Sequence, residues 1–171
     1  MEEQKVKAFQ PGLNEIVVDD GSVRVPIRNR QGDEIGNFFF RPTDIGIIDR
    51  FNEMADAFDK IVEPLESVSI KPDGTVDEEN DAGHAALKEA ENRLYEACDR
   101  IFGGNMSEAF FGKMHPFSPI GGKFYCENAL AAVGDFISRQ FAREVKKVNS
   151  RVERYTHGYE ARTGKHKNGK R

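Results

Sequence analysis

The chain has 171 residues, of which 32% are charged, with a mean hydropathy of -0.62 and a formal net charge of -4. A chain of this length can bury one core without disulfides or metal, and its two cysteines fit a reducing compartment. No stretch approaches the roughly 18 apolar residues of a membrane-spanning helix, and the start lacks the pattern of a secretion signal. We therefore expect one domain, no membrane contact and a cytoplasmic location.

Charge is distributed unevenly along the chain. From Arg143 onward ten Lys or Arg stand against three Glu, whereas the preceding residues carry 15 basic and 26 acidic side chains. A basic end of this kind fits either an arm that contacts a partner or a solvated tail attracted to its own acidic body. The tail residues that we assign as candidate contacts are Arg162, Lys165, Lys167, Lys170 and Arg171.

The N-terminal part predicts an arm followed by a β-hairpin. Residues 1–21 are polar and read as a flexible arm, with a short strand expected at 16–18. Residues 22–40 contain two strand-like segments of alternating or apolar character, separated by a polar turn. Pro26 removes a backbone donor, so its strand is expected at a sheet edge. Such a hairpin needs helices, or another chain, to pack against.

Three long helices follow, predicted at about 44–68, 82–102 and 124–154, each with an apolar stripe at spacings of three and four. The first stripe consists of Ile48, Phe51, Ala55, Phe58, Val62 and Leu65. The second consists of Leu87, Ala90, Leu94, Ala97 or Cys98, and Ile101. The third consists of Cys126, Leu130, Val133, Ile137, Phe141, Val145, Val148 and Val152.

These elements predict an α+β fold that is mainly α. An N-terminal β-hairpin packs on a bundle of three long helices in a single domain over 22–155, and a disordered basic tail follows at 156–171. Asp44 or Thr43 can cap the first helix, and Pro64 is expected to kink or stop it. Gly103-Gly104 is expected to end the second helix, and a short helix or turn follows at 105–111.

No catalytic or metal-binding motif emerges from the sequence. The acidic loop over 71–81 lacks the glycine that a calcium-binding loop needs at its sixth position. Cys98 and Cys126 lie on apolar helix faces and are interpreted as core residues. The four histidines fall in three separate regions: His84, His115, His157 and His166. We therefore predict a protein that is not an enzyme and uses no cofactor or metal.

Phenylalanines are the informative residues, and the candidate partner or self-association surface consists of Phe38, Phe39, Phe40, Phe102, Phe110 and Phe111. Side chains alternate along a strand, so Phe39 must point away from its two neighbours. Either the chain's own helices cover both faces of the hairpin, or one face meets another subunit or a client. The other three phenylalanines face the same choice, with packing onto the core as the alternative. We expect Phe39→Asp to abolish either folding or self-association.

The order of these features resembles the tail assembly chaperones of long-tailed, siphovirus-type bacteriophages. The resemblance runs from about Val23 to Tyr155. It rests on the strand pair ending Phe38-Phe39-Phe40-Arg41-Pro42-Thr43-Asp44, on Phe51, Met54 and Phe58, on the closure Cys98-Asp99-Arg100-Ile101-Phe102-Gly103-Gly104, and on Phe110-Phe111-Gly112. The polar N-terminal arm departs from the pattern.

This resemblance implies a non-enzymatic role in virus assembly. Such chaperones bind the tape-measure protein, keep it soluble, self-associate, and recruit tail-tube subunits in the bacterial host cytoplasm. They are absent from the mature virion, and many also exist as a longer, frameshifted form. One alternative is a structural, connector or small tail component retained in the virion, which purified particles would reveal. A second is a nucleic-acid-binding module using the basic tail, whose affinity would fall steeply with salt.

Overall fold

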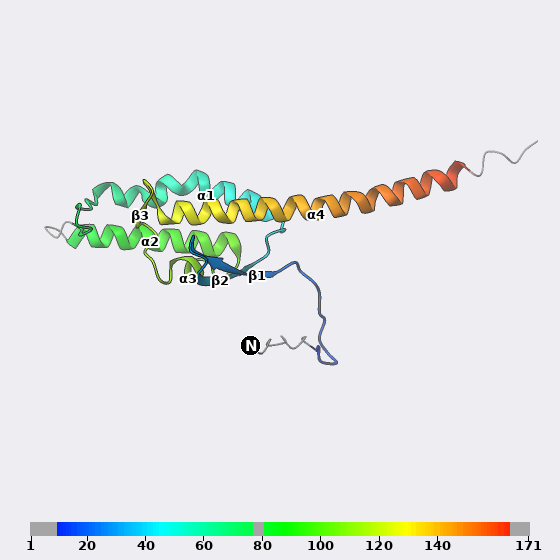
Figure 1. The fold of residues 1–171 in the computed structure, drawn as a ribbon, viewed down its shortest axis with the longest axis horizontal. Coiled ribbons are helices and arrows are strands. Elements are labelled where there is room, and N and C mark those ends of the chain that lie inside the picture. Colours follow the sequence, from blue (N-terminus) through cyan, green and yellow to red (C-terminus); the bar gives the residue numbers. More distant parts are fainter. Residues whose placement is uncertain (1–9, 77–80, 165–171) are drawn as a thin grey trace, which may run out of the picture.

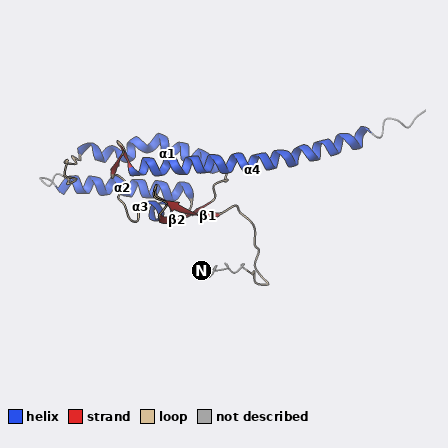
Figure 2. Ribbon diagram, in the orientation of Figure 1, coloured by secondary structure: helices blue, strands red, loops and turns tan. Residues whose placement is uncertain are grey.

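A computed structural model describes residues 10–76 and 81–164 of the chain. Most of this part is helical, and the strands form two small sheets (Figure 2). The elements, in chain order, are β1 (Val23–Arg28), β2 (Glu34–Phe40), α1 (Gly46–Val62), the 3₁₀ helix η1 (Glu63–Ser67), α2 (Asp81–Phe102), α3 (Met106–Phe111), β3 (Pro119–Ile120), β4 (Lys123–Phe124) and α4 (Tyr125–Gly164). The mainly helical α+β prediction, with an N-terminal hairpin packed on helices, is confirmed.

The three long helices lie lengthwise beside one another, and the hairpin and α3 pack against them (Figure 1). Helix α4 has 40 residues and is about 60 Å long at 1.5 Å per residue, so it projects far beyond the other helices. Its predicted end at Arg154 is wrong, because the helix continues to Gly164. The first residues of the predicted tail therefore have helical backbone, and residues 165–171 lie outside the described part.

Apolar residues of the hairpin and all the helices except η1 form one core. The predicted stripe of α2 is confirmed, since Ala90, Leu94, Cys98 and Ile101 are almost completely buried. Only the first half of the predicted α4 stripe is buried: Cys126, Val133 and Ile137 lie in the core, and Leu130 and Phe141 pack against it. The second half of that stripe is exposed, and it is treated below.

The fully buried row of helix α1 differs from the predicted stripe, although Phe51, Phe58, Val62 and Leu65 of that stripe pack half-buried against the core. The buried row is Ile47, Met54 and Ile61, at a spacing of seven residues. Ile48, expected in the core, is 40% exposed, and Ala55 is exposed as well. The helix is therefore rotated relative to the prediction, and part of the predicted apolar stripe lies along an edge that no other described element covers fully.

Local signals at the helix ends act as predicted. The Asp44 carboxylate accepts a hydrogen bond of 3.0 Å from the Gly46 N–H at the start of α1. Helix α1 gives way to η1 next to Pro64, which lacks an N–H and cannot continue the ladder. Gly103 ends α2 with a φ of 59°, in the left-handed region that glycine adopts readily.

The corner between α2 and α3 is fixed by polar contacts. Asp99, near the end of α2, accepts hydrogen bonds of 3.1 and 2.6 Å from the N–H and hydroxyl of Ser107 in α3. The Arg50 guanidinium of α1 donates to the Ile101 carbonyl at 3.0 Å. Residues 98–104, part of the pattern on which the resemblance rests, therefore have a structural role, because their contacts join α1, α2 and α3.

The hairpin is antiparallel and irregular at one point. Val23 pairs with Phe40 and Arg28 with Glu34, with a register shift next to Ile27. Pro26 lies in β1, which pairs only with β2 among the described strands, so the predicted edge position is confirmed. The expected strand at 16–18 is wrong, since these residues have no strand pairing and are exposed. A second small hairpin, β3–β4, went unrecognised in the sequence because each strand has only two residues.

Candidate functional site

Five of the six candidate phenylalanines form the core rather than a surface. Phe38, Phe40, Phe102, Phe110 and Phe111 are each less than a tenth exposed. Their rings contact one another, with the two strand residues stacked at 4.2 Å between centroids. The chain's own helices cover this face of the hairpin, so these five are wrong as a partner surface. Burial of these large aromatic side chains contributes strongly to stability.

Phe39 is the one member of that set on the surface. It is 47% exposed, and the Arg24 guanidinium lies 6.0 Å from its ring centroid. Its backbone N–H donates to the Asn105 side-chain oxygen at 3.1 Å, and the Asn105 amide donates to the Asn37 carbonyl at 3.0 Å. The Asn105 side chain thus provides hydrogen-bond partners for two backbone groups of β2. Because Phe39 is exposed, we expect Phe39→Asp to leave the fold intact, so its predicted effect is the loss of self-association.

The basic tail residues are only partly within the described chain. Arg162 belongs to the last turns of α4, where the backbone is helical and side-chain positions are not described. Lys165, Lys167, Lys170 and Arg171 lie outside the described residues.

Both cysteine thiols are free and fully buried. Burial raises the pKa of Cys126 to about 12 and raises the pKa of Cys98 further, because the interior disfavours the thiolate. Thiolates are the reactive form, so the interpretation of both residues as core residues is supported. Neither cysteine offers a nucleophile to a substrate.

We expect a thiol reagent at pH 8 to label neither Cys98 nor Cys126 in the folded protein and to label both after unfolding. Ser150→Cys, at an exposed site on α4, serves as the positive control. Because both thiols have raised pKa values in the folded state, they contribute to the free energy of unfolding below the ordinary thiol pKa of 9.0. That contribution declines as the pH rises above 9.0, where the thiols of the unfolded chain ionise first. Rapid labelling of Cys98 or Cys126 in the folded protein would contradict the expected burial of the two thiols.

Within residues 10–76 and 81–154, no group of three or more His, Cys, Asp or Glu side chains converges as metal ligands do. Two pockets in the same part of the chain are lined mainly by apolar side chains, with Glu127 in one and Arg28 and Arg139 in the other. Part of the acidic loop, residues 77–80, lies outside the description.

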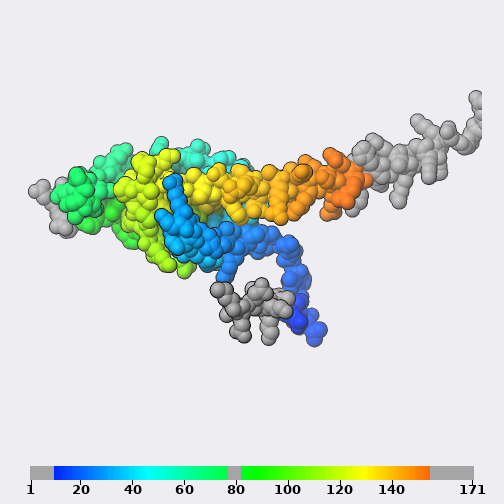
Figure 3. All heavy atoms as spheres, viewed as in Figure 1, coloured from blue at the N-terminus to red at the C-terminus, as the bar shows by residue number. Residues whose placement is uncertain are grey.

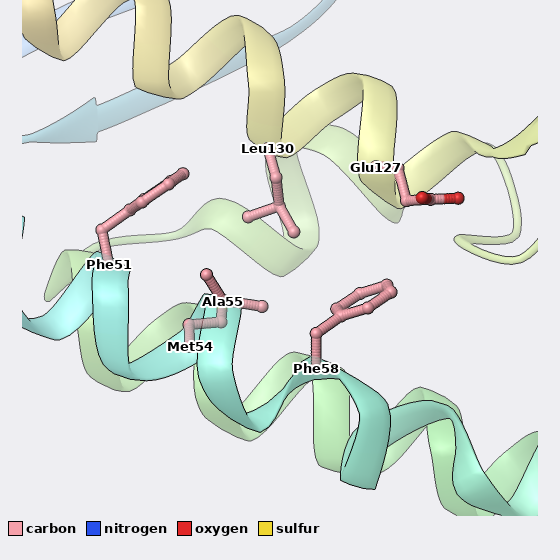
Figure 4. Close-up of a pocket in the computed structure, with 6 residues that line it drawn as sticks. All are labelled: Phe51, Met54, Ala55, Phe58, Glu127 and Leu130. Carbon is pink, nitrogen blue, oxygen red and sulfur yellow. The ribbon is translucent and has the colours of Figure 1, made fainter.

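A shallow apolar groove runs between α1 and α4, and we call it the α1–α4 groove (Figure 4). Its volume is about 280 Å³, and its lining residues are Phe51, Met54, Ala55, Phe58, Glu127 and Leu130. Leu130 points from α4 into the space between the helices, and the two phenylalanine rings flank Ala55. The Glu127 carboxylate lies at one end and accepts a hydrogen bond of 2.8 Å from the Phe124 N–H.

At the Phe51 end of the groove, a glycine of α4 lies against α1. Gly134 of α4 lies against the Phe51 ring, where a Cβ would come within 3.3 Å of it. Farther along α1, the larger side chain of Leu130 faces Ala55, and the gap stays open. Three of the groove residues belong to the apolar stripe predicted for the first helix, but their spacing did not indicate that they would stay accessible.

No helix in the described ranges is both long and apolar enough to cross a membrane. Comparisons of the chain with protein-family models, with curated proteins and with solved structures gave no match.

Proposed function

We propose that this protein is a tail assembly chaperone of the long-tailed bacteriophage type, acting without catalysis in the bacterial host cytoplasm. Its client is a helical segment of the tape-measure protein, and it keeps that segment soluble until tail-tube subunits replace it. The α1–α4 groove is the observation that carries this proposal, together with the family resemblance of the sequence.

The chemistry of the groove suits an amphipathic helix. Ala55 is exposed, and Phe51, Phe58 and Leu130 are half-buried, so all four line the groove with apolar surface that a client can contact. Helical clients present apolar side chains at spacings of three and four residues, and a groove between two helices accepts such a row. Because the groove is shallow, binding through it would be reversible, as transient cover of a client requires.

The groove is tested by placing a charge in it. Ala55→Glu is expected to weaken client binding by at least about tenfold, because a carboxylate would have to be desolvated beneath the client's apolar face. The substitution should leave the fold intact, since Ala55 is exposed. The measurement is the amount of tape-measure protein that stays soluble and co-purifies when the two proteins are co-expressed.

The matched control is Ala85→Glu, the same substitution at an exposed position of α2. We expect it to retain the client, and both variants should show unchanged circular dichroism and melting. Failure of the unmodified protein to bind the tape-measure protein would overturn the proposal. Equal binding by the two variants would refute the groove as the binding site.

The neighbouring genes give a test of the same proposal that does not depend on the groove. We expect a tail-tube gene upstream and a very long, helical tape-measure gene downstream. A slippery run near the codons for the basic tail would indicate a frameshifted longer form. Neighbours unrelated to tail assembly would contradict the proposed function.

A further inference from the structure

The projecting half of α4 presents an apolar stripe to solvent. From Ala142 to Arg154 only Glu144 is half-buried, and every other residue is exposed. Val145, Val148 and Val152, which we call the α4 stripe, are 47 to 58% exposed and follow the helical spacing of Phe141 in the body. A row of valines on a projecting helix is typical of a surface that another chain covers.

The N-terminal arm presents a second exposed apolar segment. Leu13, Ile16, Val17 and Val18 are all well over half exposed, with Ile16 at 97%. Figure 3 shows this arm standing away from the body, and Figure 1 shows that it leaves the hairpin on the side toward which α4 projects. Four large apolar side chains within six residues are costly to leave in water.

The point at which the arm joins the hairpin is fixed. The Asp20 carboxylate accepts hydrogen bonds from the Ser22 hydroxyl at 2.6 Å and from the Arg41 guanidinium at 2.6 Å. These contacts, that of Ser22 foremost, lower the pKa of Asp20 to about 2, so the carboxylate stays charged at neutral pH. The arm therefore leaves the body in a defined direction, and the exposed apolar segment lies beyond this anchor.

The two apolar surfaces carry opposite charge. Between Arg143 and Arg154 the projecting helix has five Lys or Arg and two Glu. Residues 10–22 of the arm have three acidic side chains and no Lys or Arg. Opposite charges beside apolar contacts favour pairing between arm and helix, whereas two projecting helices would repel each other. The arm segment is also long enough to span the stripe, because six extended residues reach about 20 Å and the two turns of the stripe rise about 11 Å.

We propose that the occupant of the α4 stripe is the N-terminal arm of a second copy of this chain. Both surfaces lie toward the same end of the molecule, so each copy can give its arm and receive the other's arm, in a contact with two-fold symmetry. Such an exchange covers fourteen large apolar side chains, seven from each copy. It adds two surfaces of self-association to the exposed Phe39 and holds whether or not the protein binds a tape-measure helix.

Sedimentation equilibrium of the full chain and of two single variants tests this arrangement. Ile16→Asp alters the arm and Val148→Asp alters the helix, and both sites are exposed, so folding should be unchanged. We expect the unmodified chain to be a dimer and each variant to associate at least about tenfold more weakly, because an aspartate would be buried against apolar side chains. Ser150→Asp, on the opposite side of α4, makes the same substitution away from the stripe and should remain a dimer.

Mixing the two variants gives the decisive result. In a mixed pair, the intact arm of the Val148→Asp copy meets the intact helix of the Ile16→Asp copy, so the mixture should associate more strongly than either variant alone. An unmodified chain that is monomeric would overturn the proposal. This holds even if the arm of each copy covers the α4 stripe of the same copy. A dimer that Val148→Asp breaks and Ile16→Asp leaves intact would overturn it in favour of helix-to-helix pairing.

Discussion

Phe38→Ala is expected to lower the free energy of unfolding by about 3–5 kcal/mol, the usual loss for truncating a buried phenylalanine. Phe38 is 2% exposed and stacks on Phe40. Its ring also meets Phe102 and Phe110 edge to face, with centroids at 5.9 and 5.5 Å. The truncation therefore removes contacts with three other rings and leaves a cavity between the hairpin and the helices.

The adjacent Phe39 provides the matched control. It has the same side chain on the opposite face of β2, and about half of its surface is already in contact with solvent. Phe39→Ala should cost about 1 kcal/mol or less, because surface substitutions rarely cost more. Urea denaturation of the two variants measures the difference. Equal losses at both positions would show that the hairpin faces are not buried as described.

Gly104→Ala is expected to have the second large effect, a loss of about 3 kcal/mol, at the upper end of the range for overpacking. A Cβ on Gly104 would overlap the Phe39 carbonyl oxygen, which belongs to the backbone of β2 and cannot move aside without shifting the strand. The glycine thus allows the α2–α3 corner to approach the hairpin directly. Gly36 of β2 makes a similar close approach to α3, where a Cβ would overlap the Ala109 carbonyl oxygen.

Gly46→Ala at the start of α1 is the control for this prediction. A Cβ there would come within 2.8 Å of Arg50 Nη1, at the flexible end of a side chain, and a small shift of that atom can relieve the contact while Nε keeps its hydrogen bond to the Ile101 carbonyl. We expect a change within about 1 kcal/mol, with a gain in helix propensity offsetting the adjustment. Thermal denaturation of both glycine variants tests the comparison. A Gly104→Ala protein as stable as Gly46→Ala would contradict the close approach of the hairpin to the corner.

The sequence alone was enough to predict the long helices, the N-terminal hairpin and, with them, the class of fold. Alternation marked the hairpin and spacings of three and four marked the helices, because these periods reflect the geometry of the chain itself. Asp44, Pro64 and Gly103 marked helix ends through hydrogen bonding and backbone conformation within a few residues. Such effects are local, so a single sequence is enough to reveal them.

Which apolar surfaces are covered depends on how the elements pack together. Phe38 and Phe39 are chemically identical in the sequence, and the helices on one side of the hairpin bury the first and leave the second exposed. Ile137 and Val148 belong to one stripe of α4, yet only the former lies where other elements reach. Burial depends on neighbours distant in sequence, and the α1–α4 groove and the α4 stripe are the places where this chain supplies too few of them.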